Sequence, residues 1–301
     1  MAAFLGKEDC LVFTTGFTVN EGVIPTLVDR RDYIICDDRD HASIVDGRRL
    51  SMATCLKYKH NDMADLEAQL QKCKPESGKL IIGDGVFSMD GNVCPLDKIY
   101  ELAQKYDAMV MVDESHSAGV VGVTGRGVTE RFNLKGQIEI ITGTLGKAFG
   151  GAMGGFTTGK KEIIDMLRQR SRPYLFSNSM APGLVAAGIR MFEMMSETNE
   201  LQDKLHENTD YFLRRMKEEG FDCKQSESAI CAVMIYDAAK SQQYAAKMQE
   251  EGIFVTGFYY PVVPKGEARI RVQISAGHER EHLDKCIAAF IKVGKELGVL
   301  K

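Results

Sequence analysis

The most constraining feature of the sequence is an uninterrupted apolar run, Ala108-Met109-Val110-Met111-Val112, which ends at Asp113. A strand with one wetted face alternates apolar and polar residues, whereas a continuous apolar run is typical of a parallel strand buried on both faces. Along the chain, further short apolar runs alternate with segments of helical periodicity. This is the βαβ pattern of an α/β domain built on a mostly parallel sheet.

The remaining elements extend this pattern over two predicted domains. In the first, we expect strands at residues 10–14, 33–36, 57–58, 79–83, 108–112, 138–142 and 154–158, and helices at 20–27, 42–50, 63–72, 96–106 and 160–170. Beyond Pro182, a long helical stretch runs towards Glu219, and strands at 232–236 and 268–273 then alternate with helices at 241–251 and 279–297. The sequence therefore predicts a large domain over residues 1–185 and a small α+β domain over residues 186–301.

Composition and charge exclude several classes of function. The 301 residues carry a net charge of -4, which gives no electrostatic reason to expect nucleic acid or an anionic membrane as a partner. No apolar run is long enough to span a bilayer. The eight cysteines include no C-x-x-C pair, and most lie in apolar runs, so we expect free thiols and a cytoplasmic location.

Residues able to carry chemistry follow the predicted strands at their carboxyl ends, where parallel sheets bind ligands. Pyridoxal phosphate (PLP) needs a lysine for its aldehyde, a carboxylate for its ring nitrogen, backbone N–H groups for its phosphate and a flat group on its ring. Lys147, Asp113, the turn Thr15-Gly16-Phe17 and His41 supply these four groups. Each residue alone is a common turn or surface residue, and only their joint arrangement favours a PLP site.

Two other segments resemble known functional motifs without fulfilling their requirements. The segment before Lys147 departs twice from the phosphate-binding pattern G-x-x-x-x-G-K-[ST], because Ile141 replaces the first glycine and Ala148 the hydroxyl residue. The segment from His278 to His282 spells H-E-x-x-H, but it begins a predicted helix and no third histidine follows it. We therefore expect neither ATP hydrolysis nor a zinc site, and no metal is predicted.

Arg269 and Arg271 alternate with Ile270 and Val272 on a predicted strand, which places both guanidinium groups on one face. They are either a charged exposed face or a site where one guanidinium forks onto a substrate carboxylate. The sequence leaves both readings open.

Three segments together carry a resemblance to a known family. They are residues 84–91 (DGVFSMDG), residues 112–116 (VDESH), and residues 142–147 (TGTLGK) with Gly150-Gly151 after them. All three resemble the α-oxoamine synthases, which are PLP-dependent transferases of fold type I, and the resemblance covers essentially the whole chain. Residues 168–179 and 255–264 resemble the members that use glycine and acetyl-CoA.

The resemblance implies a role for each candidate residue. Lys147 would bind PLP covalently and later move the Cα proton, Asp113 would pair with the ring nitrogen, and His116 would bond the phenolic oxygen. The other implied contacts are His41 stacked on the ring and near the substrate, Gly16, Phe17 and Thr144 at the phosphate, Ser88 beside the ring, and Arg271 on the glycine carboxylate.

The resemblance also implies a homodimer with shared active sites. Ser177 and Asn178 would reach the phosphate of the neighbouring subunit's cofactor. Family members carry about a hundred more residues before the point matching Met1, within the usual size of two-domain chains. We therefore expect an N-terminal arm to be missing from this sequence.

The implied reaction condenses glycine with acetyl-CoA to 2-amino-3-oxobutyrate and CoA, and in reverse it completes threonine breakdown. Two alternatives stay open. The chain could use another acyl-CoA or amino acid, as 8-amino-7-oxononanoate synthases do, or it could be a non-catalytic scaffold that lacks the N-terminal arm.

Overall fold

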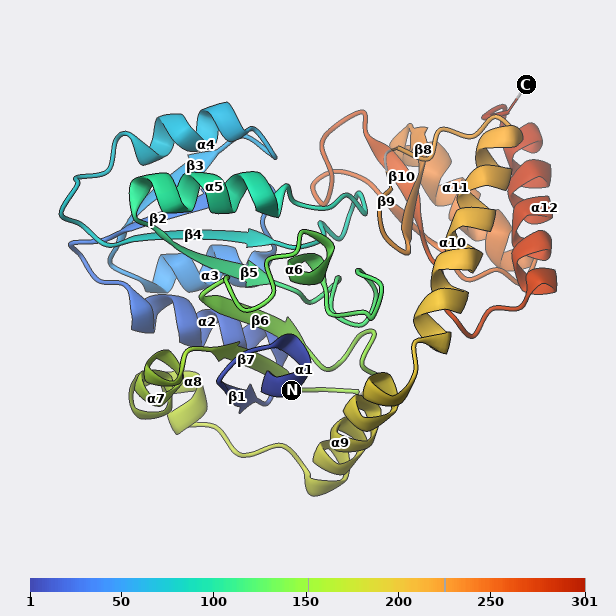
Figure 1. Cartoon of the computed structure of the whole chain (residues 1–301). Coiled ribbons are helices and arrows are strands. Elements are labelled where there is room, and N and C mark those ends of the chain that lie inside the picture. The colour runs from blue at the N-terminus through green and yellow to red at the C-terminus, as the bar shows by residue number, and fades with distance from the viewer. Residues whose placement is uncertain (151, 225, 301) are drawn as a thin grey trace. The chain divides into compact units, whose positions relative to one another are not determined.

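The computed structural model of the chain describes residues 1–150, 152–224 and 226–300 (Figure 1). The chain forms two compact units, one of residues 1–87 and 93–199 and the other of residues 88–92 and 200–301. The helical stretch after Pro182 is broken at Thr198, whose backbone is extended. The helix before this break belongs to the larger unit, whereas the sequence placed residues 186–199 in the small domain.

The larger unit alternates strands and helices as the sequence predicts, with shifts of up to four residues at their ends and with further short helices at residues 128–131 and 172–175 that were not predicted. Its strands are β1 (Asp9–Phe13), β2 (Tyr33–Asp37), β3 (Thr54–Tyr58), β4 (Lys79–Asp84), β5 (Met109–Asp113), β6 (Ile140–Thr144) and β7 (Gly155–Gly159). Its helices are α1 (Ala2–Leu5), α2 (Gly16–Leu27), α3 (Ala42–Leu50), α4 (Met63–Leu70), α5 (Leu96–Tyr106), α6 (Val128–Arg131), α7 (Lys161–Arg170), α8 (Arg172–Leu175) and α9 (Pro182–Glu197).

These seven strands form one sheet in the order β1-β7-β6-β5-β4-β2-β3. The pairs from β6 to β3 are parallel, and only β7 runs against its two neighbours. The register aligns Asp84 with Asp113 and Asp113 with Thr142, so the polar carboxyl ends of β4, β5 and β6 lie side by side. The predicted mostly parallel α/β sheet is confirmed.

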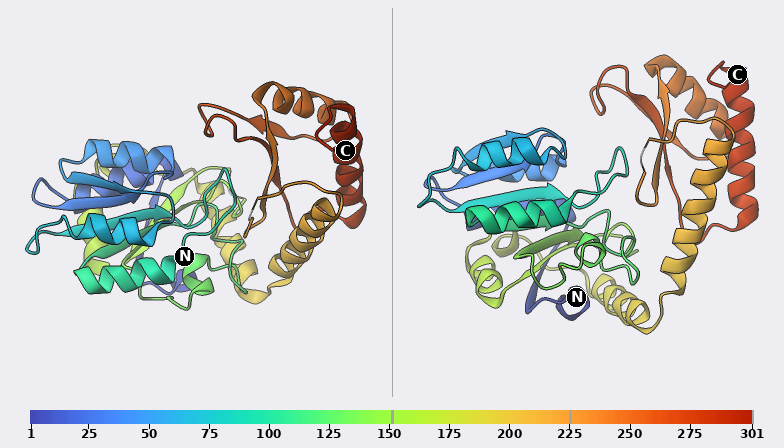
Figure 2. Two further views of the ribbon diagram at one scale, coloured as in Figure 1. Left: turned by 90° about the horizontal axis from the view of Figure 1, so that it is seen from above. Right: turned by 45° about the horizontal axis from the view of Figure 1, so that its top comes forward.

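The sheet lies between two layers of helices, as Figures 1 and 2 show for the larger unit. Helices α2, α3, α7 and α8 contact one another on one side, and α4 and α5 pack together on the other. On the first side, Val23 and Ile24 of α2 meet Ile34 of β2 and Ile140 of β6 in one buried cluster. Because strands such as β5 are covered on both faces, their sequences lack polar alternation.

The smaller unit is an α+β arrangement, as predicted. Antiparallel strands form a sheet in the order β8-β10-β9, flanked by three helices. The elements are α10 (Glu200–Glu218), β8 (Ile230–Tyr236), α11 (Ala238–Glu250), β9 (Thr256–Phe258), β10 (Ala268–Gln273) and α12 (Arg280–Glu296). Phe290 of α12 is fully buried and contacts the rings of Phe212, Phe221 and Tyr244. Over the described parts of both units, no helix has the length and apolar character needed to cross a membrane.

Candidate active site

A cavity of about 180 Å³ in the larger unit collects most of the predicted site residues. It lies where the carboxyl ends of β4, β5 and β6 meet the starts of α2 and α3. Its lining consists of Gly16, Phe17, His41, Ser43, Asp84, Asp113, Ser115, His116, Thr144 and Lys147. Seven of the predicted site residues therefore line one cavity: Gly16, Phe17, His41, Asp113, His116, Thr144 and Lys147. Ser88 belongs to the other unit.

Lys147 and His116 face each other across this cavity. Lys147 follows β6 and His116 follows β5, and because the two strands are parallel neighbours, their following turns converge. The Nζ atom of Lys147 lies 3.0 Å from Nε2 of His116. An amine and an imidazole at this distance share a hydrogen bond and can pass a proton between them.

Asp113 is a buried carboxylate at the end of β5, only 4% exposed. Its Oδ2 accepts a hydrogen bond from Asn20 Nδ2 at 2.6 Å, and its Oδ1 accepts from the backbone N–H of Ser115 at 2.9 Å. Hydrogen bonds to both oxygens fix the plane of the carboxylate. The group is therefore held in one orientation at the cavity.

Asn20 is a buried residue beside the cavity that the sequence interpretation did not name. Its side chain is fully buried, and besides Asp113 it binds Ser43 Oγ at 2.9 Å, while its Oδ1 accepts from Thr142 Oγ1 at 3.1 Å. The signal was present in the pattern, because Asn20 falls on the same helical face as Val23 and Ile24. A lone amide on a buried face calls for buried polar partners.

His41 caps the start of α3 and is tied to the same network. Its Nδ1 lies 2.8 Å from Ser43 Oγ, and its backbone N–H donates to Asp84 Oδ2 at 2.7 Å. Desolvation lowers the pKa of His41, and although the charge of Asp113 opposes this shift, desolvation prevails. A neutral imidazole is the form suited to stacking against a protonated ring.

Asp84 is a second buried carboxyl in the cavity wall. Burial raises its pKa well above the ordinary value, and the negative charge of Asp113 raises it further. The two aligned strand ends thus hold two buried carboxyl groups with different hydrogen-bond partners. Asp113 is the one that receives the side-chain hydrogen bond from Asn20.

The start of α2 lies at the cavity. The hydroxyl of Thr15 caps the helix by accepting from the N–H of Thr18 at 3.2 Å, and Gly16 and Phe17 are the first helical residues. A Cβ atom at position 16 would lie 2.7 Å from the Thr144 side chain, so glycine is needed for this close approach. N–H groups and the helix dipole at such a terminus favour a phosphate.

These donors and acceptors fit PLP. The cavity presents an amine for an aldehyde, a buried carboxylate for a ring nitrogen, imidazoles for the ring and its oxygen, and a helix start for a phosphate. Gly16 leaves the helix start accessible beside Thr144, where any larger residue would fill the space.

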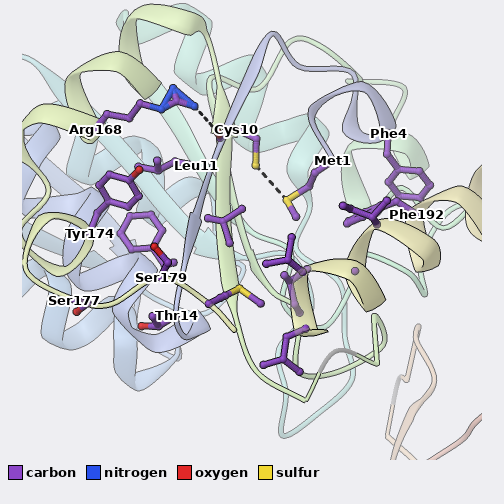
Figure 3. Close-up of a pocket in the computed structure, with 18 of the residues that line it drawn as sticks. Met1, Phe4, Cys10, Leu11, Thr14, Arg168, Tyr174, Ser177, Ser179 and Phe192 are labelled. Atoms are coloured by element: carbon purple, nitrogen blue, oxygen red, sulfur yellow. Dashed lines mark hydrogen bonds between the residues drawn. The ribbon is translucent and has the colours of Figure 1, made fainter. Parts of the chain in front are cut away.

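Ser177 and Asn178 lie elsewhere in the larger unit. Both line a second cavity of about 950 Å³, between β1 and the segment that connects α8 to α9 (Figure 3). Its walls are largely apolar and include Leu11 and Phe192, with the Arg168 guanidinium bound to the Cys10 carbonyl at one end. These two predicted residues therefore do not line the Lys147 cavity of their own chain.

Ser88 and Arg271 belong to the smaller unit. Arg271 Nη1 donates to the Ser88 carbonyl oxygen at 3.1 Å, and the guanidinium lies 5.1 Å from the centre of the Phe258 ring. No carboxylate of the described residues pairs with Arg271. Arg269 is different, because it is 1% exposed and forms ion pairs with Asp90 and, at 3.0 Å, with Glu267.

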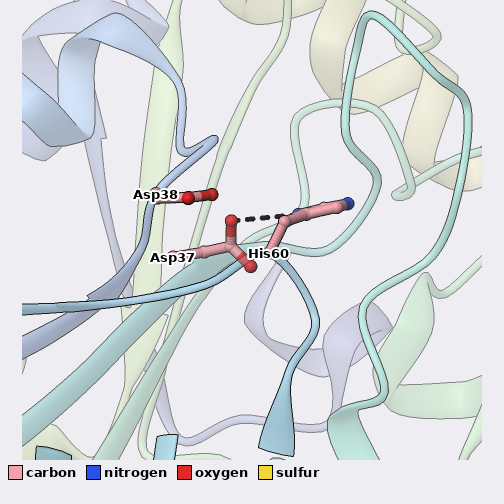
Figure 4. Close-up of side chains that lie close together, drawn as sticks. All are labelled: Asp37, Asp38 and His60. Carbon is pink, nitrogen blue, oxygen red and sulfur yellow. Dashed lines mark hydrogen bonds and ion pairs between the residues drawn. The ribbon is translucent and has the colours of Figure 1, made fainter. Parts of the chain in front are cut away.

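Within the described residues, one group of side chains could supply three ligand atoms to a metal ion. This group lies away from the H-E-x-x-H segment of residues 278–282 in the sequence. Asp37, Asp38 and His60 bring one ligand atom each within 4.8 Å of one another (Figure 4). Asp37 is engaged in the fold, since it accepts from His60 Nδ1 at 3.0 Å and from the N–H of Asn61 at 2.9 Å. At the other segment, His282 Nδ1 accepts from the N–H of Glu279, which caps α12.

Comparisons with known proteins show which family the chain resembles. The model of the family described as aminotransferase class I and II matches residues 1–290. The 2-amino-3-ketobutyrate coenzyme A ligase of Escherichia coli K12 is 50% identical over 302 residues, which cover all of this chain and 76% of that protein. An 8-amino-7-oxononanoate synthase of Petrotoga mobilis is 48% identical and is covered to 77%.

The fold is shared with solved structures that contain PLP. A serine palmitoyltransferase variant from S. paucimobilis, solved with PLP bound, superimposes with a TM-score of 0.95 at 32% identity. The alignment covers 99% of this chain and 75% of that one.

Proposed function

Because the chain belongs to the class I and II aminotransferase family, and within it to the PLP-dependent α-oxoamine synthases, we propose that it is a glycine C-acetyltransferase. It condenses glycine with acetyl-CoA to 2-amino-3-oxobutyrate and CoA, or catalyses the reverse reaction in threonine breakdown. The observation that carries the proposal is the Lys147 cavity, which supplies each group that PLP needs, in a chain half identical to a 2-amino-3-ketobutyrate coenzyme A ligase.

Lys147 is the residue that attaches PLP and moves the proton of the glycine Cα. When bound, PLP supplies an electron sink for the charge that this proton leaves behind. The imidazole of His116, 3.0 Å from Nζ, orients the amine and would hydrogen-bond the phenolic oxygen of the cofactor. Asp113 would pair with the ring nitrogen, because Asn20 and the Ser115 N–H hold its carboxylate in place.

The remaining residues bind the cofactor and the substrate. Gly16 and Phe17 would give N–H groups to the phosphate and Thr144 a hydroxyl, while His41 would stack on the ring and border the substrate. The family resemblance implies that Ser88 would contribute to the ring pocket. Arg271 binds the glycine carboxylate, a role supported by its lack of a carboxylate partner within the described residues and by the two parallel N–H groups of a guanidinium.

The active enzyme is a cytoplasmic homodimer. Ser177 and Asn178 line a largely apolar cavity beside exposed apolar side chains such as Phe176 and Ile189, which are 83% and 57% exposed. Exposed apolar surface of this kind is typical of protein–protein contacts. From this surface the two polar residues would reach the phosphate of the partner's cofactor. Light scattering on the purified protein tests the dimer, and a monomer without cofactor would instead support a non-catalytic scaffold.

The second candidate function uses the same site with a different acyl-CoA as the acyl donor. The 48% identity to an 8-amino-7-oxononanoate synthase favours it almost as strongly as the first candidate. Glycine, alanine and serine are each offered with a panel of acyl-CoA thioesters, and the products are identified by mass. We expect the highest kcat/KM for glycine with acetyl-CoA, and preference for a longer acyl chain would assign the chain to the second candidate.

The attachment of PLP is tested by Lys147→Ala, with the exposed Lys160→Ala as the matched control. We expect Lys147→Ala to lack the visible absorbance of lysine-linked PLP and to lose at least about 10²-fold in kcat, the usual scale for removal of a proton-transfer group. Lys160→Ala keeps both. Equal activity of Lys147→Ala and the unmodified protein would refute the assignment.

A further inference from the structure

Two cysteines on neighbouring strands of the larger unit form a thiol pair outside the proposed active site. Cys36 lies on β2 and Cys55 on β3, the strand at the edge of the sheet. In the parallel register Ile34 pairs with Cys55 and Cys36 pairs with Lys57, so both thiols point to the same face of the sheet. Their sulfur atoms are 3.7 Å apart.

The two thiols differ in access to solvent. Cys55 is exposed, whereas Cys36 is buried behind it, with 1% of its surface exposed. All eight cysteines of the chain are free thiols. Cys55 is the exposed one, so a small oxidant reaches it first, and Cys36 is then the nearest second thiol.

An arginine side chain binds both sulfurs. Arg48 Nη1 donates to Cys55 Sγ at 3.2 Å and to Cys36 Sγ at 3.4 Å. The hydrogen bond from Cys36 and the positive charges of Arg48 and Lys57 lower the pKa of Cys55 to about 6. The hydrogen bond with Cys55 and burial raise the pKa of Cys36, and the charge of Asp40 adds to the effect. At neutral pH, Cys55 is therefore the thiolate of the pair, and a thiolate is the reactive form.

We propose that Cys55 and Cys36 are a peroxide-sensitive site that closes into a reversible disulfide. The Cys55 thiolate attacks one oxygen of hydrogen peroxide, the O–O bond breaks, and hydroxide leaves and takes a proton to form water, which yields a sulfenic acid. The Cys36 sulfur then gives up its proton and attacks the Cys55 sulfur, the S–O bond breaks, and a second water leaves. Two electrons pass from the thiols to the peroxide, and two waters are formed.

The second step is favoured by the first. Oxidation of Cys55 removes the negative sulfur that raises the pKa of Cys36, while Arg48 stays within hydrogen-bond distance of both sulfurs. The sulfurs must close from 3.7 Å to about 2.05 Å, a movement within the reach of side-chain rotation and a small strand shift. The edge position of β3 leaves one of its sides without a strand partner in the sheet.

A second cysteine pair in the chain provides an internal comparison. A hydrogen bond from Cys231 lowers the pKa of Cys223 in the smaller unit, but both side chains are buried, at 2% and 0% exposure. If a lowered pKa alone determined reactivity, this pair would react as well. We expect it to stay reduced, because peroxide does not reach it.

The experiment treats the reduced full chain with hydrogen peroxide at pH 7, blocks the remaining thiols and maps the peptides by mass spectrometry. The expected product is a Cys36–Cys55 linked peptide with the mass of two hydrogens lost, restored by dithiothreitol. Cys55→Ser abolishes the product, and Cys36→Ser leaves a sulfenic acid at Cys55 that dimedone traps. Arg48→Met slows the reaction of Cys55 about tenfold at pH 7, because the thiolate fraction falls.

The matched control is Cys223→Ser, which forms the linked peptide at the rate of the unmodified chain. Unfolding midpoints of all variants are measured so that loss of folding is not taken for loss of reactivity. Reaction of Cys55 no faster than that of Cys10, or linkage of Cys55 to a thiol other than Cys36, would overturn the proposal.

Discussion

Asn20 Nδ2 lies 2.6 Å from Asp113 Oδ2, and the same amide nitrogen lies 2.9 Å from Ser43 Oγ. Through Ser43, which is hydrogen-bonded to His41 Nδ1, one buried amide connects the carboxylate for the ring nitrogen with the imidazole for the ring face. The hydroxyl of Thr142 donates a hydrogen bond to the Oδ1 atom of the same amide at 3.1 Å. Asn20 is thus a positioning residue for two proposed cofactor contacts.

Asn20→Ala is expected to weaken PLP binding and to lower activity about tenfold. The substitution leaves Asp113, Ser43 and Thr142 without this partner, and each unsatisfied buried group costs about 1–3 kcal/mol. Because Asp113 would then lose the side-chain hydrogen bond that orients its carboxylate, the pH at which the absorbance of bound PLP changes should shift as well. Spectrophotometric pH titration of the PLP-loaded protein measures this shift.

Thr142→Val is the control for this prediction. It removes the hydrogen bond to Asn20 Oδ1 and leaves the contact between Asn20 and Asp113 in place. We expect some loss of stability with an unchanged titration. If both variants shift the titration equally, Asn20 acts through general packing and not through Asp113.

The sequence predicted the gathering of Asp113, His116, Thr144 and Lys147 because parallel strands place their carboxyl ends at one edge. This inference needs only element type and direction, both of which follow from apolar runs and helical periodicity. Asn20 was missed for a related reason. The helical pattern places Asn20 on the buried face of α2, but only the tertiary structure shows that Asp113 of β5 lies opposite it.

The pairing of Arg269 and Arg271 is a second feature that could not be predicted from the sequence. The alternation places both on one face of β10, and it leaves open which of them is paired. Only the structure brings residues 88–92, far away in sequence, beside Arg269, where Asp90 neutralises it. The break at Thr198 and the short strand β9 were likewise unpredicted, since neither has a strong periodic signal.

Arg271→Lys is expected to raise the KM for glycine about tenfold to a hundredfold, with a smaller effect on kcat. A lysine keeps the positive charge but loses the two parallel N–H donors that fit a carboxylate. Steady-state kinetics with glycine varied at saturating acetyl-CoA measure the change.

Arg269→Met is the contrasting variant. It leaves the Asp90 carboxylate, 7% exposed, with Lys224 Nζ at 2.9 Å as its remaining cation, and the loss of a hydrogen bond to a charged group costs about 1.5–3 kcal/mol. We expect a lower unfolding midpoint with little change in the KM for glycine among molecules that remain folded. An unchanged KM in Arg271→Lys would remove Arg271 from the proposed substrate site.

His116→Phe is expected to shift the absorbance maximum of bound PLP and to reduce kcat by about 10²-fold. The substitution keeps a ring of similar size and removes the nitrogen that lies 3.0 Å from Lys147 Nζ. Removal of a group that orients or assists proton transfer has effects of this size. His206→Phe, on a helix of the smaller unit, should change neither quantity. If the unmodified protein, His116→Phe and His206→Phe all have the same absorbance spectrum, His116 does not contact the cofactor or its lysine.

Glu114 gives the chain a stability that depends on pH. The residue is fully buried, and burial raises its pKa to about 7 even though Ser117 and the N–H groups of Val128 and Thr129 donate to it. In the unfolded chain its pKa returns to the ordinary value of 4.5. Between these values the folded state binds more protons than the unfolded state, so this group's contribution to stability is present below about pH 4.5 and is lost as the pH rises through about 7.

We therefore expect Glu114→Gln to reduce the loss of stability between pH 5 and pH 8. A pKa raised from 4.5 to about 7 corresponds to a contribution on the order of 3 kcal/mol over the whole range. Urea unfolding of the unmodified protein, Glu114→Gln and the exposed Glu162→Gln at pH 5, 6, 7 and 8 measures the difference. Glu162→Gln should follow the unmodified protein. If Glu114→Gln does so too, the carboxyl of Glu114 is ionised throughout this range, and its hydrogen bonds outweigh the effect of burial.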